Sequence, residues 1–189
     1  MEVFRRTDVM HKFMRNLIIA ILFLSLNSCQ KHDGSKKDSV KKSEKPLDKF
    51  EKTELQVLEE SNVGKVFVYD FTHNTDCNKS KIKYLGIVNV SNIEYKIMTS
   101  FLVTGESCRG SSSIKIYDLE NNYFGEYPVG LPEDLPDELK EDKLLFSQKD
   151  TQCSRRKNYT ISLEKELPKE IFIPCTESGG DLYSLVTEK

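Results

Sequence analysis

Histidine is scarce in this chain of 189 residues, and the scarcity limits its catalytic options. Only His11, His32 and His73 are present, so after residue 32 His73 alone could act as a histidine general base. The G-x-S-x-G motif of many serine hydrolases is missing as well. We therefore expect no catalytic residues, and a hydrolase with an unrecognised site is the alternative that these absences leave open.

The spacing of cysteines and acidic residues does not match a metal site. Zinc sites usually take ligand pairs about two to four residues apart, whereas Cys77, Cys108, Cys153 and Cys175 are isolated from one another. The acidic segment 130–143 lacks the fixed spacing of an EF-hand calcium loop. The sequence therefore predicts no metal and no cofactor.

The part of the chain that can fold also has no excess of basic residues. Residues 29–52 hold eight lysines against five acidic side chains, whereas residues 53–189 hold 16 basic and 23 acidic side chains. A domain that binds nucleic acid needs a basic face to meet the phosphates. We expect no nucleic-acid partner for a domain of this charge.

Composition also predicts how the chain is organised. Residues 29–52 are too polar and too highly charged to bury a core, which predicts a flexible tether. Residues 53–189 have the length of one domain. Apolar residues at helical spacing after Pro46 predict a short helix that leads from the tether into this domain.

Most of residues 53–189 alternate between apolar and polar side chains, which is the period of a half-buried strand. Turn-forming pairs such as Ser91-Asn92 and Asn121-Asn122 separate the alternating segments. The expected fold class is all-β, with a single antiparallel β-sandwich or a small barrel behind the tether. Nine strands are expected, at 65–71, 81–90, 93–103, 113–119, 123–129, 143–146, 159–164, 170–174 and 182–187.

Two details of this pattern predict local structure. A straight strand over residues 81–90 would place Ile82, Tyr84 and Val88 on one face, because side chains alternate along a strand. The segment 130–143 breaks the alternation with two prolines. Pro136 followed by acidic residues predicts a helix of one or two turns there.

A short apolar run near the N-terminus ends at a single cysteine. Leu17 to Leu26 is shorter than the roughly 20 residues that a membrane-spanning helix needs, but it fits the core of a signal peptide. Arg15 precedes the run, and Leu26-Asn27-Ser28-Cys29 ends it. This tetrapeptide resembles the lipobox of bacterial lipoproteins. The resemblance implies that residues 1–28 are a signal peptide, cleaved before Cys29, and that Cys29 carries acyl chains such as palmitate.

The same resemblance implies a location. Each buried CH₂ group contributes about 0.8 kcal/mol, so two or three acyl chains on one cysteine would hold the protein firmly at a membrane. Gln30 stands where many inner-membrane lipoproteins have an aspartate, which by family analogy favours the outer membrane. The sequence leaves open whether the protein faces the periplasm or the outside.

Four cysteines follow Cys29, and an even number in an exported domain predicts disulfide bonds. Cys77 and Cys108 lie in the loops after the first and third expected strands. These loops share one end of a sheet whose strands run up and down in chain order. Cys153 and Cys175 flank two strands that would form a hairpin with both cysteines at its open end. We therefore predict the pairs Cys77–Cys108 and Cys153–Cys175.

Two loops place arginines beside these cysteines. Arg109 lies among a glycine and three serines, and Arg155 and Arg156 follow Cys153. If the two loops share one end of the domain, their guanidinium groups and exposed N–H groups would form a small anion-binding surface. Solvated loop charges are the simpler interpretation of the same residues.

These observations favour a lipid-anchored, exported, β-rich protein that binds or interacts without catalysing a reaction. Its expected partners are the membrane, through the lipid anchor, and an unidentified protein or a small anionic ligand. An inhibitor or immunity-type protein that blocks an extracellular enzyme is the alternative. Such a protein would show a protruding rigid loop or a large exposed apolar patch.

Overall fold

The computed structural model describes residues 46–73, 77–147, 153, 159–176 and 179–187. All of them belong to one compact unit, Lys45–Lys189. Strands dominate this part of the chain, and all of its strand pairings are antiparallel. The expected all-β class is confirmed. The barrel alternative is wrong, because the largest sheet among the described residues stays open, with β1 at one edge and β11 at the other.

The largest sheet has six strands in the order β1-β2-β3-β4-β5-β11. A tight turn with positive φ angles joins β2 to β3, with Ser91 at φ 49° and Asn92 at φ 70°. Gly125 permits the pairing of β5 with β11, because a Cβ atom there would lie 2.5 Å from the carbonyl oxygen of Val186. The strands are β1 (Val66–Asp70), β2 (Cys77–Val90), β3 (Ile93–Gly105), β4 (Arg109–Tyr117), β5 (Tyr123–Val129) and β11 (Val186–Thr187).

Two smaller sheets complete the described strands. One has the order β6-β7-β8 and the other pairs β9 with β10. The hairpin expected between the strands now labelled β8 and β9 is therefore wrong, because each of them pairs with a different neighbour. The strands are β6 (Glu138–Lys140), β7 (Lys143–Phe146), β8 (Tyr159–Ser162), β9 (Glu170–Pro174) and β10 (Gly180–Ser184).

The helix expected after Pro46 is present as α2 (Lys49–Glu60). Asp48 caps its N-terminus by accepting hydrogen bonds from two backbone N–H groups, and the Glu51 carboxylate accepts one from the Asp48 N–H, which completes a capping box. Ser61, at φ 51°, ends the helix in the left-handed conformation. The helix crosses residue 53, where the sequence placed the boundary between tether and domain.

The helix expected at Pro136 is wrong. A short 3-10 helix, η1, lies earlier, at Pro132–Asp134. Just after Pro136, the Asp137 N–H donates to the Leu145 carbonyl at 2.8 Å, and Glu138 then pairs with Leu145. The backbone of this segment is therefore engaged with β7, which leaves it unable to form helical hydrogen bonds.

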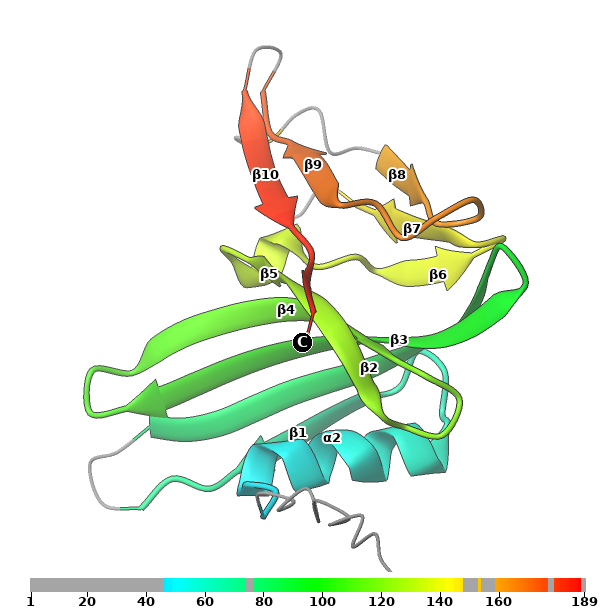
Figure 1. Cartoon of the computed structure of the whole chain (residues 1–189). Helices are drawn as coiled ribbons and strands as arrows, with labels where there is room; N and C mark the ends of the chain where they lie inside the picture. Colours follow the sequence, from blue (N-terminus) through cyan, green and yellow to red (C-terminus); the bar gives the residue numbers. More distant parts are fainter. Residues whose placement is uncertain (1–45, 74–76, 148–152, 154–158, 177–178, 188–189) are drawn as a thin grey trace, which may run out of the picture. The chain divides into compact units, whose positions relative to one another are not determined.

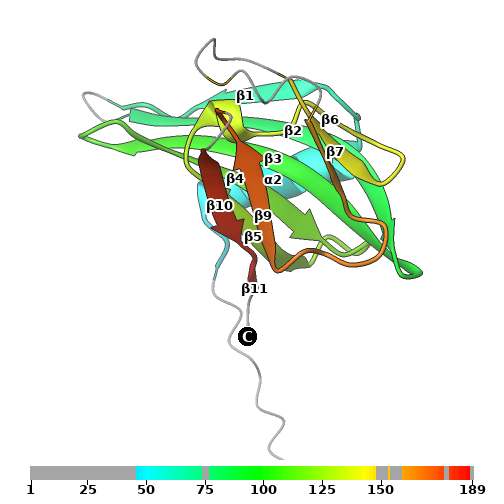
Figure 2. The same ribbon diagram turned by 90° about the horizontal axis from the view of Figure 1, so that it is seen from above.

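The six-stranded sheet separates two cores. In Figures 1 and 2, α2 lies along one face of the sheet, and the strands β6 to β10 lie on the other. On the helix side, Val57 and Leu58 pack with Tyr84 and other sheet residues. On the opposite side, a larger core joins the sheet to the small sheets, with residues such as Leu144 and Ile173 fully buried.

A bulge in β2 allows this strand to serve both cores. The pairing with β3 shifts between Tyr84 and Gly86, and Gly86 has φ 130°, a backbone angle that L side chains rarely adopt. As a result, Ile82 and Tyr84 face the helix, whereas Leu85 and Val88 face the small sheets. The expectation that Ile82, Tyr84 and Val88 share one face is therefore wrong.

Candidate ligand cleft beside strand β2

Both predicted disulfide pairs are confirmed. The Cα atoms of Cys77 and Cys108 lie 5.1 Å apart, and those of Cys153 and Cys175 lie 4.0 Å apart. The first pair forms for the predicted reason, because β1 to β4 run up and down in order. The second pair forms although the hairpin used to predict it does not exist.

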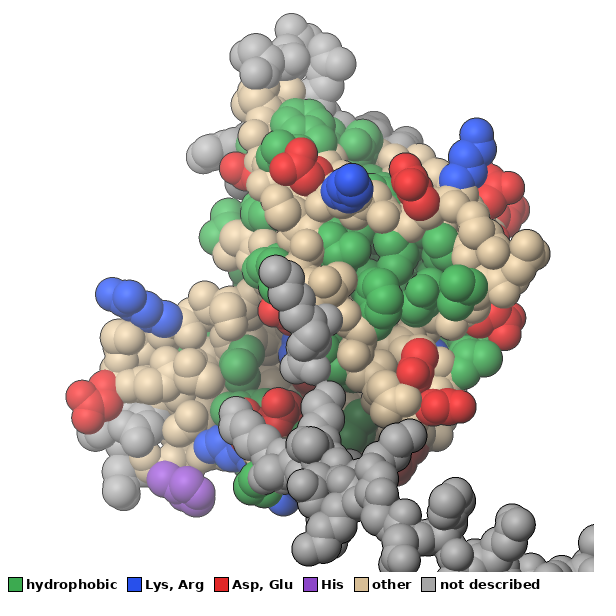
Figure 3. Space-filling model, in the orientation of Figure 1, with side chains coloured by type: hydrophobic (Ala, Val, Ile, Leu, Met, Phe, Trp, Pro, Cys, Tyr) green, Lys and Arg blue, Asp and Glu red, His purple; other side chains and the backbone are tan. Residues whose placement is uncertain are grey.

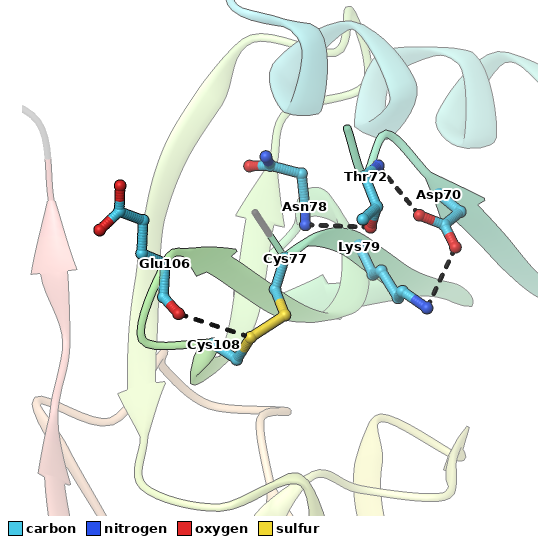
Figure 4. Close-up of a disulfide and its surroundings, with 7 residues drawn as sticks. All are labelled: Asp70, Thr72, Cys77, Asn78, Lys79, Glu106 and Cys108. Carbon is cyan, nitrogen blue, oxygen red and sulfur yellow. Dashed lines mark hydrogen bonds and ion pairs between the residues drawn. A yellow bond between two sulfur atoms is a disulfide. The ribbon is translucent and has the colours of Figure 1, made fainter. Parts of the chain in front are cut away.

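The Cys77–Cys108 disulfide joins the start of β2 to the turn between β3 and β4 (Figure 4). Beside it, the Asp70 carboxylate accepts a hydrogen bond from the Thr72 N–H at 3.0 Å and forms an ion pair with Lys79 at 3.1 Å. The hydrogen bonds from Thr72, followed by the contribution of Lys79, lower the pKa of Asp70 to about 2. This end of the sheet is therefore tied together by one covalent bond and several polar contacts.

Of the three arginines expected to form an anion-binding surface, one lies among the described residues. Arg109 begins β4, next to Cys108, and is exposed. Arg155 and Arg156 lie outside the described residues, as does the expected lipidation site Cys29. Whether the two arginine loops meet therefore stays a prediction.

A cleft of about 380 Å³ lies between the six-stranded sheet and the segment that contains η1. We call it the β2 cleft. Its sheet side presents side chains of both apolar and basic character, and its loop side is rich in proline and acidic residues. The lining residues are Val66, Lys81, Ile82, Lys83, Thr99, Phe101, Pro132, Glu133, Leu135, Pro136 and Asp137.

Strand geometry places the basic groups of the β2 cleft. Lys81 and Lys83 are two residues apart on β2, so they extend from the same face of the sheet. The Lys83 ammonium donates to the Asp137 carbonyl at 2.8 Å, which links β2 to the loop wall. Lys81 is exposed and makes no ion pair with the described residues.

The loop wall brings negative charge to the same cleft. Glu133 and Asp137 both line it. The Asp137 carboxylate accepts a hydrogen bond from the Ser147 N–H at 2.7 Å, so it is held against the chain that follows β7. The cleft thus has a basic wall on the sheet and an acidic wall on the loop.

Phe101 forms an apolar part of the sheet wall because its neighbour lacks a side chain. A Cβ atom on Gly110 would lie 2.8 Å from the Phe101 ring. Glycine at this position therefore leaves the ring room to lie across β4. The result is a cleft that combines an aromatic surface with a nearby ammonium group.

A second polar cluster lies on the opposite face of the sheet, under α2. The Glu54 carboxylate accepts hydrogen bonds from Ser100 at 2.9 Å, Lys115 at 2.7 Å and Tyr117 at 2.9 Å. Burial, and then the nearby Glu54 charge, raise the pKa of Tyr117. Because its polar groups satisfy one another in the interior, we assign this cluster to attachment of the helix and not to ligand binding.

The acidic segment 130–143 is more structured than a solvated loop. Asp134 is buried, and its carboxylate accepts hydrogen bonds from the Leu131 N–H at 3.2 Å and the Tyr183 hydroxyl at 2.7 Å. Burial, and then the hydrogen bond to Asp134, raise the pKa of Tyr183 to about 12. This contact fixes η1, and with it the loop wall of the cleft, to β10.

The surface seen in Figure 3 carries side chains of both charge signs, interspersed with apolar groups. Within the described ranges, no three His, Cys, Asp or Glu side chains gather as metal ligands would. None of the helices in these ranges is long and apolar enough to cross a membrane.

The sequence contains one local signal for the β2 cleft, carried by lysines that were not among the expected site residues. In "KSKIKY", Lys79, Lys81 and Lys83 alternate with other residues inside a strand, so all three point to one face. No comparable signal marked the loop wall, because its approach to β2 depends on contacts distant in sequence. Searches of protein-family models, curated proteins and solved structures found no match to this chain.

Proposed function

We propose that the protein is a lipid-anchored, exported binding protein without catalytic activity, held at the outer membrane through Cys29. Its binding site is the β2 cleft, and its partner is a protein segment or a small ligand that carries negative charge. The lipobox-like sequence ending at Cys29 supports the anchor. The chemistry of the cleft supports the binding role.

One observation carries the binding role: Lys81 lines the β2 cleft beside apolar side chains and has no ion pair to the described residues. Ligand sites are usually clefts of roughly 300–1,000 Å³ that combine apolar walls with polar groups. The β2 cleft has this size, and its lining combines apolar side chains with charged ones. An ammonium group beside Val66 and Phe101 suits a partner that joins a carboxylate or phosphate to an apolar group.

The anchor leads to a prediction about membrane association. Full-length wild-type protein should carry acyl mass and sediment with membranes, whereas Cys29→Ser should carry none and appear in the soluble fraction. Intact-mass spectrometry and membrane fractionation would measure both. Unmodified wild-type protein, or equal membrane association of the two forms, would show that the anchor is not at Cys29.

Photocrosslinking in the host cell would test the binding role. A benzoylphenylalanine at position 66, on the cleft wall, should give an adduct detectable by intact mass whether the partner is small or large. Adding Lys81→Glu should reduce the adduct yield at least 10-fold, because the change replaces attraction for an anion with repulsion.

Two matched variants make this experiment specific. Lys165→Glu changes charge by the same amount at an exposed site far along the chain and should leave the adduct intact. A photocrosslinker at Val186, 53% exposed compared with 43% for Val66, should not give the same adduct. No adduct from position 66, or one unaffected by Lys81→Glu, would contradict the proposed function.

A further inference from the structure

The outermost strand of the large sheet, β1, is open on one side. It has five residues, and within the described part of the chain it pairs only with β2. At the opposite edge, β11 has only two residues. β1 is therefore the longer of the two open edges of this sheet.

The hydrogen-bond pattern shows which backbone groups of β1 point outward. The Phe71 N–H donates to the Asn78 carbonyl at 2.6 Å, so Phe71 faces β2. In an antiparallel pair this orientation alternates, which places Phe67 and Tyr69 toward β2. The N–H and C=O groups of Val66 and Val68 consequently point away from the sheet, where an added strand would meet them.

β1 lacks the features that usually protect an edge strand. Proteins commonly place proline, lysine or a bulge at such an edge to prevent pairing with other chains. β1 has none of these, and Val66 and Val68 are 43% and 69% exposed. Its charged residue, Asp70, comes last in the strand and is engaged by Thr72 and Lys79. An unprotected apolar edge of this kind is suited to binding an extended segment by strand addition.

The neighbouring strand indicates the charge of that segment. Val66 is paired with Lys83 and Val68 with Lys81, so the two valines and these lysines share one face of the sheet. A residue added opposite Val68 would lie two strands from Lys81, about 10 Å away between Cα atoms. Because valine is short, the long Lys81 side chain can extend over it toward a carboxylate at that position.

We propose that β1 binds an extended acidic segment of a partner protein as an additional strand, with an acidic side chain next to Val68 and Lys81. This inference rests on the proposed binding role, because Val66 and Lys81 also line the β2 cleft. It identifies the partner as a polypeptide, whose backbone pairs with β1 and whose side chains on one face reach the cleft.

Amide hydrogen exchange on the full-length protein in detergent micelles would test the pairing. The probe is a capped seven-residue peptide of alternating valine and glutamate. It should slow exchange at Val66 and Val68 at least 10-fold while leaving Phe67 and Tyr69 unchanged, because those two already face β2. A peptide with lysine in place of glutamate, and one N-methylated at alternate nitrogens, should bind at least 10-fold more weakly.

A pair of surface variants separates pairing at β1 from general apolar adhesion. Val68→Pro leaves the charge unchanged but removes an outward N–H group that an added strand would pair with, and it should weaken peptide binding at least 10-fold. Val186→Pro makes the same change at the opposite edge of the sheet and should leave binding unchanged. Equal effects of both variants would overturn the proposal.

Three further results would also overturn it. Equal affinity for the lysine peptide and the glutamate peptide would show that Lys81 does not select an acidic segment. Protection of Val66 and Val68 without peptide, rising with protein concentration, would show that a second copy of the chain occupies the edge. An adduct at position 66 that depends on Lys81, with no protection of β1 by the peptide, would refute the added strand while retaining ligand binding in the cleft.

Discussion

Glu54→Ala is expected to lower the free energy of unfolding by about 3 kcal/mol, because it removes the only carboxylate that two buried hydroxyl groups and one partly buried ammonium group share in the described structure. The side chain of Glu54 is 5% exposed and that of Lys115 is 20% exposed. Without Glu54, the Lys115 ammonium keeps a single ion pair with the described residues, a longer one with Glu126 at 3.9 Å. The hydroxyl groups of Ser100 and Tyr117 lose an acceptor at the same time. Urea unfolding followed by circular dichroism would measure the change.

The same helix supplies the control. Glu59→Ala makes an identical substitution at an exposed position of α2 and should change the free energy of unfolding by less than about 0.5 kcal/mol. Adding Lys115→Met to Glu54→Ala should lower the free energy of unfolding only slightly further, because it removes the charge that Glu54→Ala leaves without its main partner. Equal stability of Glu54→Ala and Glu59→Ala would show that the cluster does not hold the helix to the sheet.

The Glu54 cluster illustrates what sequence patterns do not contain. Its partners lie 46 to 63 residues away, on two different strands. The helix itself was predictable, because Pro46 and the spacing of apolar residues are local signals. The burial of an acidic residue on its inner face was not, because it depends on the polar residues that the sheet happens to present beneath it.

The strands, too, follow partly from local sequence and partly from contacts that are distant in sequence. Alternation predicted where most strands lie, since the side-chain period of a strand is set by its own backbone. It did not predict the bulge in β2, where Gly86 changes the faces of all later residues in the strand. Nor did it predict that β8 and β9 join different sheets, because the choice of pairing partner depends on the whole core.

The candidate site also combines features that local sequence predicts with features that depend on distant contacts. The lysines of the β2 cleft follow from alternation along one strand, so their common face could have been predicted. The loop wall could not, because it is positioned by the hydrogen bond from Lys83 to Asp137 and by the contact of Asp134 with Tyr183. Both contacts join segments about 50 residues apart.

Removal of either disulfide by paired substitution should lower the free energy of unfolding by about 3–4 kcal/mol in the chain-entropy model. The two bonds join residues 31 and 22 positions apart, so their loop-closure contributions are nearly equal. Cys153 is buried, at 5% exposure, whereas Cys108 is exposed. The double variant without Cys153 and Cys175 should therefore lose more free energy of unfolding than the one without Cys77 and Cys108. The reason is that it also removes packed sulfur from the interior. Urea unfolding of the two double variants would measure both effects.

Exposure also predicts the order in which the bonds are reduced. Thiol–disulfide exchange requires access of the attacking thiolate, so dithiothreitol under native conditions should open Cys77–Cys108 before Cys153–Cys175. Alkylation at successive times followed by peptide mapping would identify the order, and the starting sample would verify the pairs. The prediction is wrong if Cys153–Cys175 opens first. The pairing itself is wrong if mapping of the unreduced protein joins Cys77 to Cys153 or Cys175.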